Sequence, residues 1–319
     1  MDWFSVRAGL PAIEKPADRV AKVRELLKNN PEDPAGRALF INVLLDAGQI
    51  DEAMAVANRL RRDELAGPDV LATLCDLQAE VGLESEAKRT CSELVEYNPD
   101  AADARQMLGD LFLRHGWFDA AYRQYSTLVE LNGDDPVSLL RLAIAAAGMG
   151  REDEALRIER KVASGDGEIG PNDPRRFARL LSAVKLAMML EKAPSEKVDD
   201  ATGVALERAL KRTQNFNGPA TMTFLVWNDF EVPLSLAATV DKVPFTLSDS
   251  VRSQAVGLMM IDVGPKPPQN LTLEVKIDGP VTRRPVPFKV VTIVWDGTRF
   301  QIRSQQNMVL KPGTNSAQL

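Results

Sequence analysis

The chain has 319 residues, of which 45% are hydrophobic and 26% are charged, a composition typical of a soluble protein with room for two domains. Its net charge of −6 argues against nucleic-acid binding, because phosphate recognition needs a clustered basic face. The longest apolar run, Leu142 to Met149, is too short to cross a bilayer, so we expect no membrane insertion.

The N-terminal region predicts a helical lead-in over residues 1–33. Residues 1–5 lack the basic and apolar stretches of a signal peptide. We therefore expect a cytoplasmic protein if the chain is complete, and a periplasmic or extracellular one if it is part of a longer secreted protein. Ala17 to Leu27 has helical apolar spacing and ends before Asn30-Pro31, which predicts a helix that caps whatever follows.

Residues 34–164 carry one short pattern four times. The pattern is Gly-x-x-x-x-Ala, and its glycines are Gly48, Gly82, Gly116 and Gly150, so the period is 34 residues. A repeated helix–turn–helix hairpin produces a fixed period of this length. The pattern divides the region into repeats 34–67, 68–101, 102–135 and 136–164.

Each position of the pattern has a physical role. The glycine ends the first helix of a hairpin, where a left-handed or tightly turned backbone is needed. The acidic residues after it, such as Asp51-Glu52, open the second helix and complement its dipole. The alanine lets the two helices approach closely.

The four repeats resemble the tetratricopeptide repeat (TPR) family. The third repeat has the family's small, aromatic and apolar residues most fully, at Leu108, Gly109, Phe112, Gly116, Ala121, Tyr125 and Leu128. The other repeats depart from the pattern, with Ile41, Cys75 and Ala143 where the early glycine would stand. The resemblance implies a right-handed α-helical solenoid whose first helices line a concave groove that binds a protein or peptide.

The family's groove positions fall mainly on acidic residues of this chain. Transferred residue by residue, they are Asn42, Asp46, Asp69, Asp76, Glu80, Asp103, Gln106, Asp110 and Arg114. An acidic groove favours a basic partner segment. The alternative is that these side chains are solvated faces of helices without a partner.

Two further observations limit what this resemblance implies. Chaperone-binding members of the family hold a terminal carboxylate with Lys and Asn; Asn42 fits, but Ala38 stands where the Lys is required. In the fourth repeat the groove positions are apolar, at Val137, Leu140, Ile144 and Ala147. We expect the helix over 175–191, rather than a partner, to cover them.

The two cysteines, Cys75 and Cys91, lie in the first and second helix of one repeat, both at inward-facing positions. One interpretation is a pair of small buried thiols. The other is a disulfide that joins the hairpin in an oxidising compartment. The sequence leaves both open.

After residue 164 the helical repeat pattern ends. Residues 165–214 read as a glycine-rich connector with helices over 175–191 and 200–213. From 215 to 310 the apolar period is two, as in Leu271 to Ile277, and Asp296-Gly297 predicts a hairpin turn. Further strands are expected at 222–227, 234–240, 256–263 and 288–294. The fold class is therefore α + β in two domains, a helical solenoid followed by a small antiparallel β-sandwich or barrel, with a loose tail at 311–319.

Helical repeats followed by a β domain are similar to the C-terminal part of bacterial proteins that carry a von Willebrand factor A domain. The matching features are the domain order and the strand rhythm of 222–240 and 270–302. This gives an alternative function: an envelope- or carbohydrate-recognition protein acting through Trp227 or Trp295 of the β domain, with the repeats as an assembly platform.

No catalytic constellation is visible in the sequence. Gly165, Gly167 and Gly170 form a G-x-G-x-x-G, but a helix precedes them and Pro171 follows, so they predict a turn rather than a dinucleotide site. The single histidine, His115, lies at a helix end, where its charge is favourable for dipole reasons alone. We expect a non-enzymatic scaffold or adaptor without cofactor or metal.

Overall fold

A computed structural model describes residues 1–96, 100–165, 173–192, 219–241, 243–244, 250–253, 256–262, 264, 270–279, 281–295 and 300–319. The chain forms two compact units, Met1–His115 and Gly116–Leu319. Three predictions lie outside the described residues: the helix at 200–213, the turn at Asp296-Gly297 and the connector from residue 166 to 172. Within the described ranges, no helix is long and apolar enough to cross a membrane.

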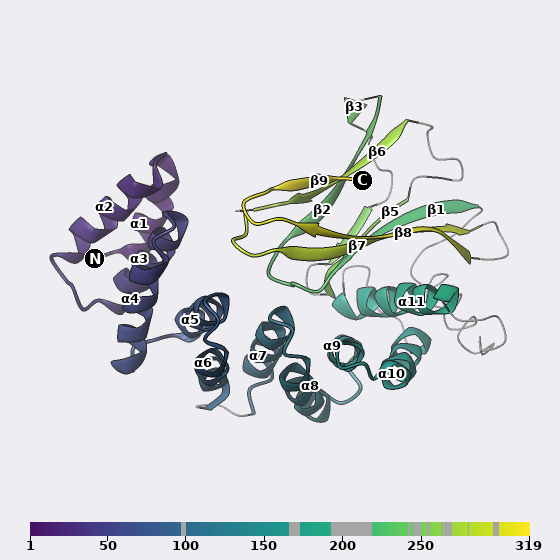
Figure 1. Cartoon of the computed structure of the whole chain (residues 1–319), viewed down its shortest axis with the longest axis horizontal. Coiled ribbons are helices and arrows are strands. Elements are labelled where there is room, and N and C mark those ends of the chain that lie inside the picture. The colour runs from purple at the N-terminus through teal and green to yellow at the C-terminus, as the bar shows by residue number, and fades with distance from the viewer. Residues whose placement is uncertain are drawn as a thin grey trace. The chain divides into compact units, whose positions relative to one another are not determined.

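The first unit is a run of helical hairpins (Figure 1). Its elements are α1 (Trp3–Gly9), the 3-10 helix η1 (Leu10–Ala12), α2 (Pro16–Leu27), α3 (Pro34–Asp46), α4 (Ile50–Arg62), α5 (Pro68–Glu80), α6 (Glu84–Glu96) and α7 (Ala102–Arg114). The second unit continues with α8 (Phe118–Asn132), α9 (Pro136–Gly148), α10 (Glu152–Ser164) and α11 (Pro174–Lys192). The helices α3, α5, α7 and α9 begin 34 residues apart, at residues 34, 68, 102 and 136.

The repeated glycines and alanines do what the pattern predicts. The four glycines have φ of 72°, 81°, 73° and 75°, in the left-handed region that glycine adopts without strain. The four alanines, Ala53, Ala87, Ala121 and Ala155, are at most 2% exposed. In the hairpins α3–α4, α5–α6 and α9–α10 the paired helices pack against each other. The prediction of a tetratricopeptide-type helical array is confirmed.

The lead-in contains a helix, α1, that the sequence pattern did not indicate. Asp2 caps it, because its carboxylate accepts hydrogen bonds from the backbone N–H groups of Phe4 and Ser5 at 3.1 and 3.2 Å. Trp3 packs its indole onto α3 at Gly36, where a Cβ would lie 2.3 Å from the ring. Helix α1 therefore depends on a glycine in the first turn of α3. The predicted helix at 17–27 is confirmed as α2.

The C-terminal part is a sandwich of two open antiparallel sheets (Figure 1). One sheet has the order β4-β5-β1-β7-β8 and the other β3-β2-β6-β9. The strands are β1 (Ala220–Trp227), β2 (Leu234–Val240), β3 (Val243–Pro244), β4 (Ser250–Ser253), β5 (Leu258–Asp262), β6 (Leu271–Ile277), β7 (Val286–Trp295), β8 (Phe300–Leu310) and β9 (Ser316–Gln318). Of the two predicted architectures, the sandwich is correct, because neither sheet closes on itself.

The strand β1 is buried along its whole length. Its inward side chains, Leu225 and Trp227, join the core between the two sheets, together with Leu234 and Val275 of the facing sheet. Its outward side chains, such as Phe224, are also buried. Helix α11 lies along that outer face, so the first sheet is covered on both sides (Figure 1).

The predicted loose tail at 311–319 is corrected by the structure. Ser316–Gln318 form β9, whose register on β6 pairs Val275 with Ala317. Ala317 and Leu319 pack against the core of the sandwich. The short, mostly polar sequence gave no alternation long enough to indicate this strand.

Candidate functional site

The predicted groove residues all lie on α3, α5 and α7, the first helices of the hairpins in the unit Met1–His115. Their exposure separates them into three groups. Five are exposed, namely Asn42, Asp46, Asp69, Glu80 and Asp103. Gln106 and Asp110 are half-buried. The side chains of Asp76 and Arg114 are only 12% and 3% exposed.

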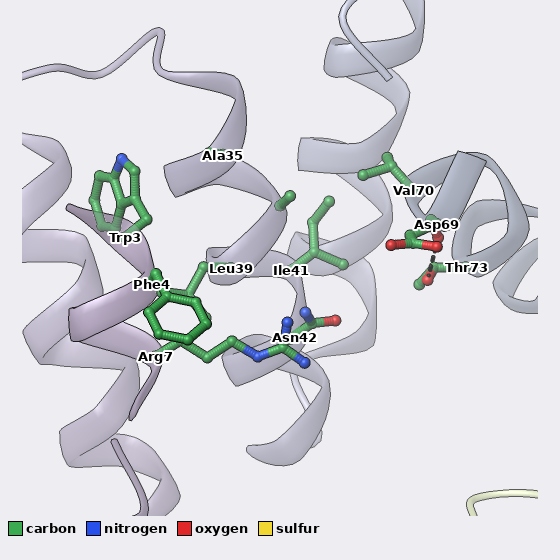
Figure 2. Close-up of a pocket in the computed structure, with 11 residues that line it drawn as sticks. Trp3, Phe4, Arg7, Ala35, Leu39, Ile41, Asn42, Asp69, Val70 and Thr73 are labelled. Atoms are coloured by element: carbon green, nitrogen blue, oxygen red, sulfur yellow. Dashed lines mark hydrogen bonds between the residues drawn. The ribbon is translucent and has the colours of Figure 1, made fainter. Parts of the chain in front are cut away.

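Two of the exposed residues, Asn42 and Asp69, line one pocket of about 280 Å³ (Figure 2). Phe4 and Arg7 of α1 stand on one side of the pocket, and Asp69 of α5 stands on the other. Ile41 and Asn42 of α3 lie between them. The pocket therefore combines an aromatic ring, a cation, an amide and a carboxylate with apolar side chains.

Small side chains on α3 leave room for this pocket. Ala35 and Ala38 line it at positions where a longer residue would fill the space. Ala38 is the residue that departs from the family's carboxylate clamp, so its methyl group opens the pocket instead of supplying a cation. Phe4 is 83% exposed, an unusual state for a large apolar side chain that borders a pocket.

Sequence reasoning missed Phe4 and Arg7, because both belong to α1. The signal was present in the peptide Asp2-Trp3-Phe4-Ser5, where an N-cap aspartate precedes an aromatic pair. A helix of 7 residues is too short to show a period of 3.6, so only its cap could have indicated it.

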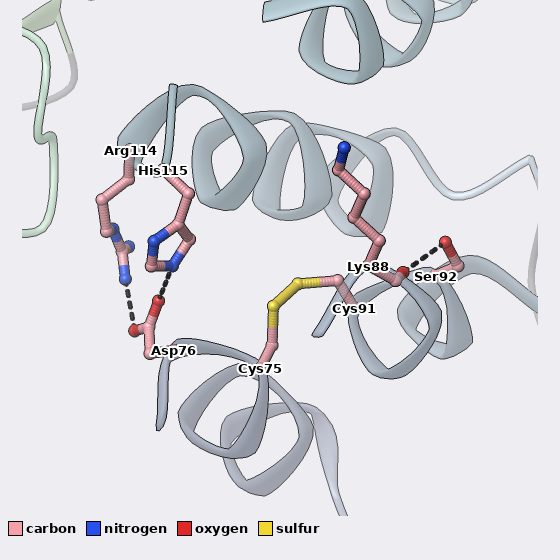
Figure 3. Close-up of a disulfide and its surroundings, with 7 residues drawn as sticks. All are labelled: Cys75, Asp76, Lys88, Cys91, Ser92, Arg114 and His115. Atoms are coloured by element: carbon pink, nitrogen blue, oxygen red, sulfur yellow. Dashed lines mark hydrogen bonds and ion pairs between the residues drawn. A yellow bond between two sulfur atoms is a disulfide. The ribbon is translucent and has the colours of Figure 1, made fainter. Parts of the chain in front are cut away.

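Asp76 connects α5 to the end of α7 (Figure 3). Its Oδ2 accepts a hydrogen bond from Nη1 of Arg114 at 2.6 Å, and its Oδ1 lies 2.6 Å from Nε2 of His115. An ionised carboxylate only accepts hydrogen bonds, so Nε2 carries the hydrogen. Asp76 and Arg114 were predicted as groove residues, but they neutralise each other within the chain. The role of His115 is likewise an internal contact.

Cys75 and Cys91 are joined in a disulfide that ties α5 to α6 in the same hairpin (Figure 3). Their Cα atoms are 5.5 Å apart, within the range that a disulfide spans, and both residues are fully buried. Of the two interpretations that the sequence left open, the structure has the bonded one. The bond directly precedes Asp76, so it holds the segment that carries the Asp76–Arg114 ion pair.

In the fourth hairpin, Leu140 and Ile144 of α9 are buried, and α11 packs against α9 as predicted. Of the other two apolar groove positions, Val137 is half-buried and Ala147 is exposed. Arg141 is 2% exposed and stacks on the ring of Phe230, a residue in the loop after β1. The guanidinium carbon of Arg141 lies 4.6 Å from the centroid of that ring. The exposed polar residues among the predicted groove positions therefore lie on α3, α5 and α7.

The alternative site in the β domain is not supported by Trp227, which is 1% exposed and belongs to the core of the sandwich. A buried indole cannot stack on a sugar ring. The side chain of Trp295 lies outside what the structure describes. In the described part of the chain, no cluster of three or more His, Cys, Asp or Glu residues could hold a metal ion.

The fold defines a protein of helical hairpins of the tetratricopeptide type followed by an antiparallel β-sandwich. No protein-family model and no curated protein sequence matches the chain. Solved structures similar to it include YrrB, described as a TPR protein with an unusual peptide-binding site, which is 17% identical over 48% of this chain and 78% of that one with a TM-score of 0.37.

Two other solved structures are also similar to part of the chain. MamA AMB-1 is 20% identical over 49% of this chain and 82% of its own, with a TM-score of 0.37. A tetratricopeptide repeat protein from Parabacteroides merdae is 16% identical over 66% of this chain and 92% of its own, with a TM-score of 0.42. None of these comparisons concerns the von Willebrand resemblance, which stays a prediction.

Proposed function

We propose that this protein is a non-enzymatic scaffold that binds a basic polypeptide segment along the inner face of α3, α5 and α7. The observation that carries the proposal is the pocket between α1, α3 and α5 (Figure 2). It places an exposed aromatic ring opposite an exposed carboxylate over apolar side chains. A lysine or arginine side chain fits this arrangement, because its stem packs on apolar surface while its charge contacts Asp69 and the face of Phe4.

The charge of the rest of this inner face supports a basic partner. Asp46, Glu80 and Asp103 are exposed there, and they extend the negative charge of Asp69 along all three helices. Arg19 reduces this only in part, since its Nη1 lies 3.8 Å from Asp46, which is 55% exposed. Arg7 at the rim supplies a donor for a backbone carbonyl of the partner.

The proposal is tested by selecting peptides from a random library on the full chain and measuring their affinities by calorimetry. We expect the selected peptides to be rich in Lys and Arg. Asp69→Lys should weaken their binding at least about tenfold, because a charge-assisted contact of roughly 1.5–3 kcal/mol becomes a repulsion. Phe4→Ala should also weaken it. The matched control is Asp51→Lys, an exposed aspartate on α4, the second helix of the preceding hairpin α3–α4.

Two results would contradict this function. One is a set of selected peptides with no excess of basic residues. The other is an equal effect of Asp69→Lys and Asp51→Lys, which would mean that only the overall charge of the protein matters.

A further inference from the structure

The strand β8 is the longest sheet edge among the described strands. The other edges are β4, β3 and β9, with 4, 2 and 3 residues, whereas β8 has 11. On one side β8 pairs with β7. The other side of an edge strand presents backbone N–H and C=O groups that an added strand can bond. The proposed binding of a basic segment by α3, α5 and α7 makes no use of this edge.

Most of β8 lacks the features that usually protect an edge strand, which are charged side chains, proline and bulges. A bulge occurs where the register shifts between Thr292 and Ile293 of β7, so that Arg303 is the extra residue. The seven residues after it, 304–310, contain no charged residue and no proline. Within them Val309 is a large apolar side chain that is 52% exposed. The stretch 304–310 is therefore suited to pair with another strand.

Positive charges lie at both ends of this uncharged stretch. Arg303 precedes it and Lys311 follows it, and both are exposed. Two copies of the chain that paired their 304–310 stretches antiparallel and in full register would place Arg303 of one copy opposite Lys311 of the other. Like charges directly opposite each other destabilise a strand pair. The charges therefore disfavour a second copy and favour a segment with a carboxylate at each end.

A pocket of about 380 Å³ reaches the C-terminal part of β8. Val309 of β8 lines it together with Met188 of α11 and Val226 of β1, and the stems of Lys185 and Lys289 add further hydrocarbon. The strand register places the two valines on the outer face of the sheet, along which α11 lies. A strand beside β8 directs every second side chain to this face, so an apolar side chain there can enter the pocket.

We propose that β8 binds an extended polypeptide segment as an added strand, and that this segment has an uncharged, alternately apolar middle and a carboxylate at each end. Backbone hydrogen bonds to 304–310 provide the affinity, and an apolar side chain of the segment packs at Val309. The two carboxylates lie near Arg303 and Lys311. Because seven residues separate these two cations, seven residues also separate the carboxylates of the segment.

The test uses the full chain and the peptide Glu-Thr-Val-Thr-Leu-Thr-Val-Thr-Glu, acetylated and amidated at its ends. The peptide reads the same in both directions, so it presents its carboxylates to Arg303 and Lys311 in either orientation of the added strand. We expect saturable binding in calorimetry and slower hydrogen exchange of backbone amides within 304–310. A version that is methylated on the amide nitrogens of all seven middle residues cannot donate to the edge, and it should bind at least about tenfold more weakly.

Charge reversal separates binding at this edge from the effect of overall charge. The double variant Arg303→Glu/Lys311→Glu should bind the peptide at least about fivefold more weakly, because two attractions become repulsions. The same variant should bind a version of the peptide with Lys at both ends more tightly than the unchanged chain does. The matched control is Arg62→Glu/Arg157→Glu, at exposed positions of α4 and α10, which changes the net charge equally and should leave binding unchanged.

Four results would overturn the proposal. The first three are equal binding of the methylated peptide, no change of hydrogen exchange within 304–310, and equal losses in the two double variants. The fourth is a dimer of the chain, detected by sedimentation, whose amides within 304–310 are protected without any peptide, because a second copy would then occupy the edge.

Discussion

At the scale of single residues, Asp76 has the largest structural role among the predicted groove residues. Both of its carboxylate oxygens are used, one by Arg114 and one by His115. The side chain of Arg114 is 3% exposed, so water cannot replace Asp76 as its partner. Removing a partner of a buried charge costs far more than losing an exposed ion pair.

We therefore predict that Asp76→Ala lowers the free energy of unfolding by about 3–5 kcal/mol. Asp69→Ala, at an exposed position of the same helix, should change it by less than about 0.5 kcal/mol. Urea denaturation followed by circular dichroism measures both. Equal stabilities of the two variants would show that Asp76 is no more structural than a solvated helix residue.

The residue-level predictions that succeeded depend on local backbone geometry. Gly48 and its three counterparts end helices with positive φ, and this requirement is contained in the few residues around each glycine. The pairing of Asp76 with Arg114 joins residues 38 apart, so it depends on how α5 and α7 pack. The 34-residue period of the sequence placed both residues on the inner side of their helices, but it could not show that they contact each other.

At the scale of elements, the sequence predicted those with a long apolar period and missed the short or polar ones. The strands β2 and β6 were predicted with their observed bounds, because one face of each is buried in the sandwich. Most of β8 was missed, since residues such as Gln305 and Gln306 lie on an edge strand of its sheet, where polar side chains reach solvent. The tertiary pairing with β7 determines that strand.

At the scale of elements, the disulfide between α5 and α6 is expected to stabilise this hairpin. Cys75 and Cys91 are 16 residues apart, and closing a loop of about 15 residues stabilises a folded chain by roughly 3 kcal/mol. We expect no free thiol in the denatured, unreduced protein. Reduction should lower the thermal midpoint of the unit Met1–His115.

The control is the variant Cys75→Ala/Cys91→Ala, whose thermal midpoint should be low and should not respond to reductant. Two reactive thiols in the unreduced protein would contradict the disulfide. Such a bond persists in oxidising compartments, so a positive result would also favour the expectation of a periplasmic or extracellular protein.

At the scale of the whole molecule, the sequence predicted helices followed by strands and the packing of α11 on α9, but not that α11 also lies on the β-sheet. Its apolar residues indicated a broad buried face, and Phe177, Leu181 and Val184 are indeed buried. A helical period shows that a face is covered and does not name what covers it. In the structure α11 packs on α9 and α10 and also lies along the outer face of the first sheet. The predicted domain bounds 165–214 and 215–310 stay a prediction.

This dual packing predicts that the sandwich is not an independent domain. A fragment of residues 215–319 lacks α11, and the outward side chains Met222, Phe224, Val291 and Ile293, all buried in the full chain, would meet solvent. Exposed apolar patches of this kind promote association. We expect the fragment 215–319 to aggregate or bind a hydrophobic dye in size-exclusion and fluorescence measurements, whereas the fragment 116–319, which keeps α11, should be monomeric and fold cooperatively. A monomeric 215–319 fragment with the amide spectrum that these residues have in the full chain would show that the sandwich needs no helix, and would place the domain boundary at residue 215.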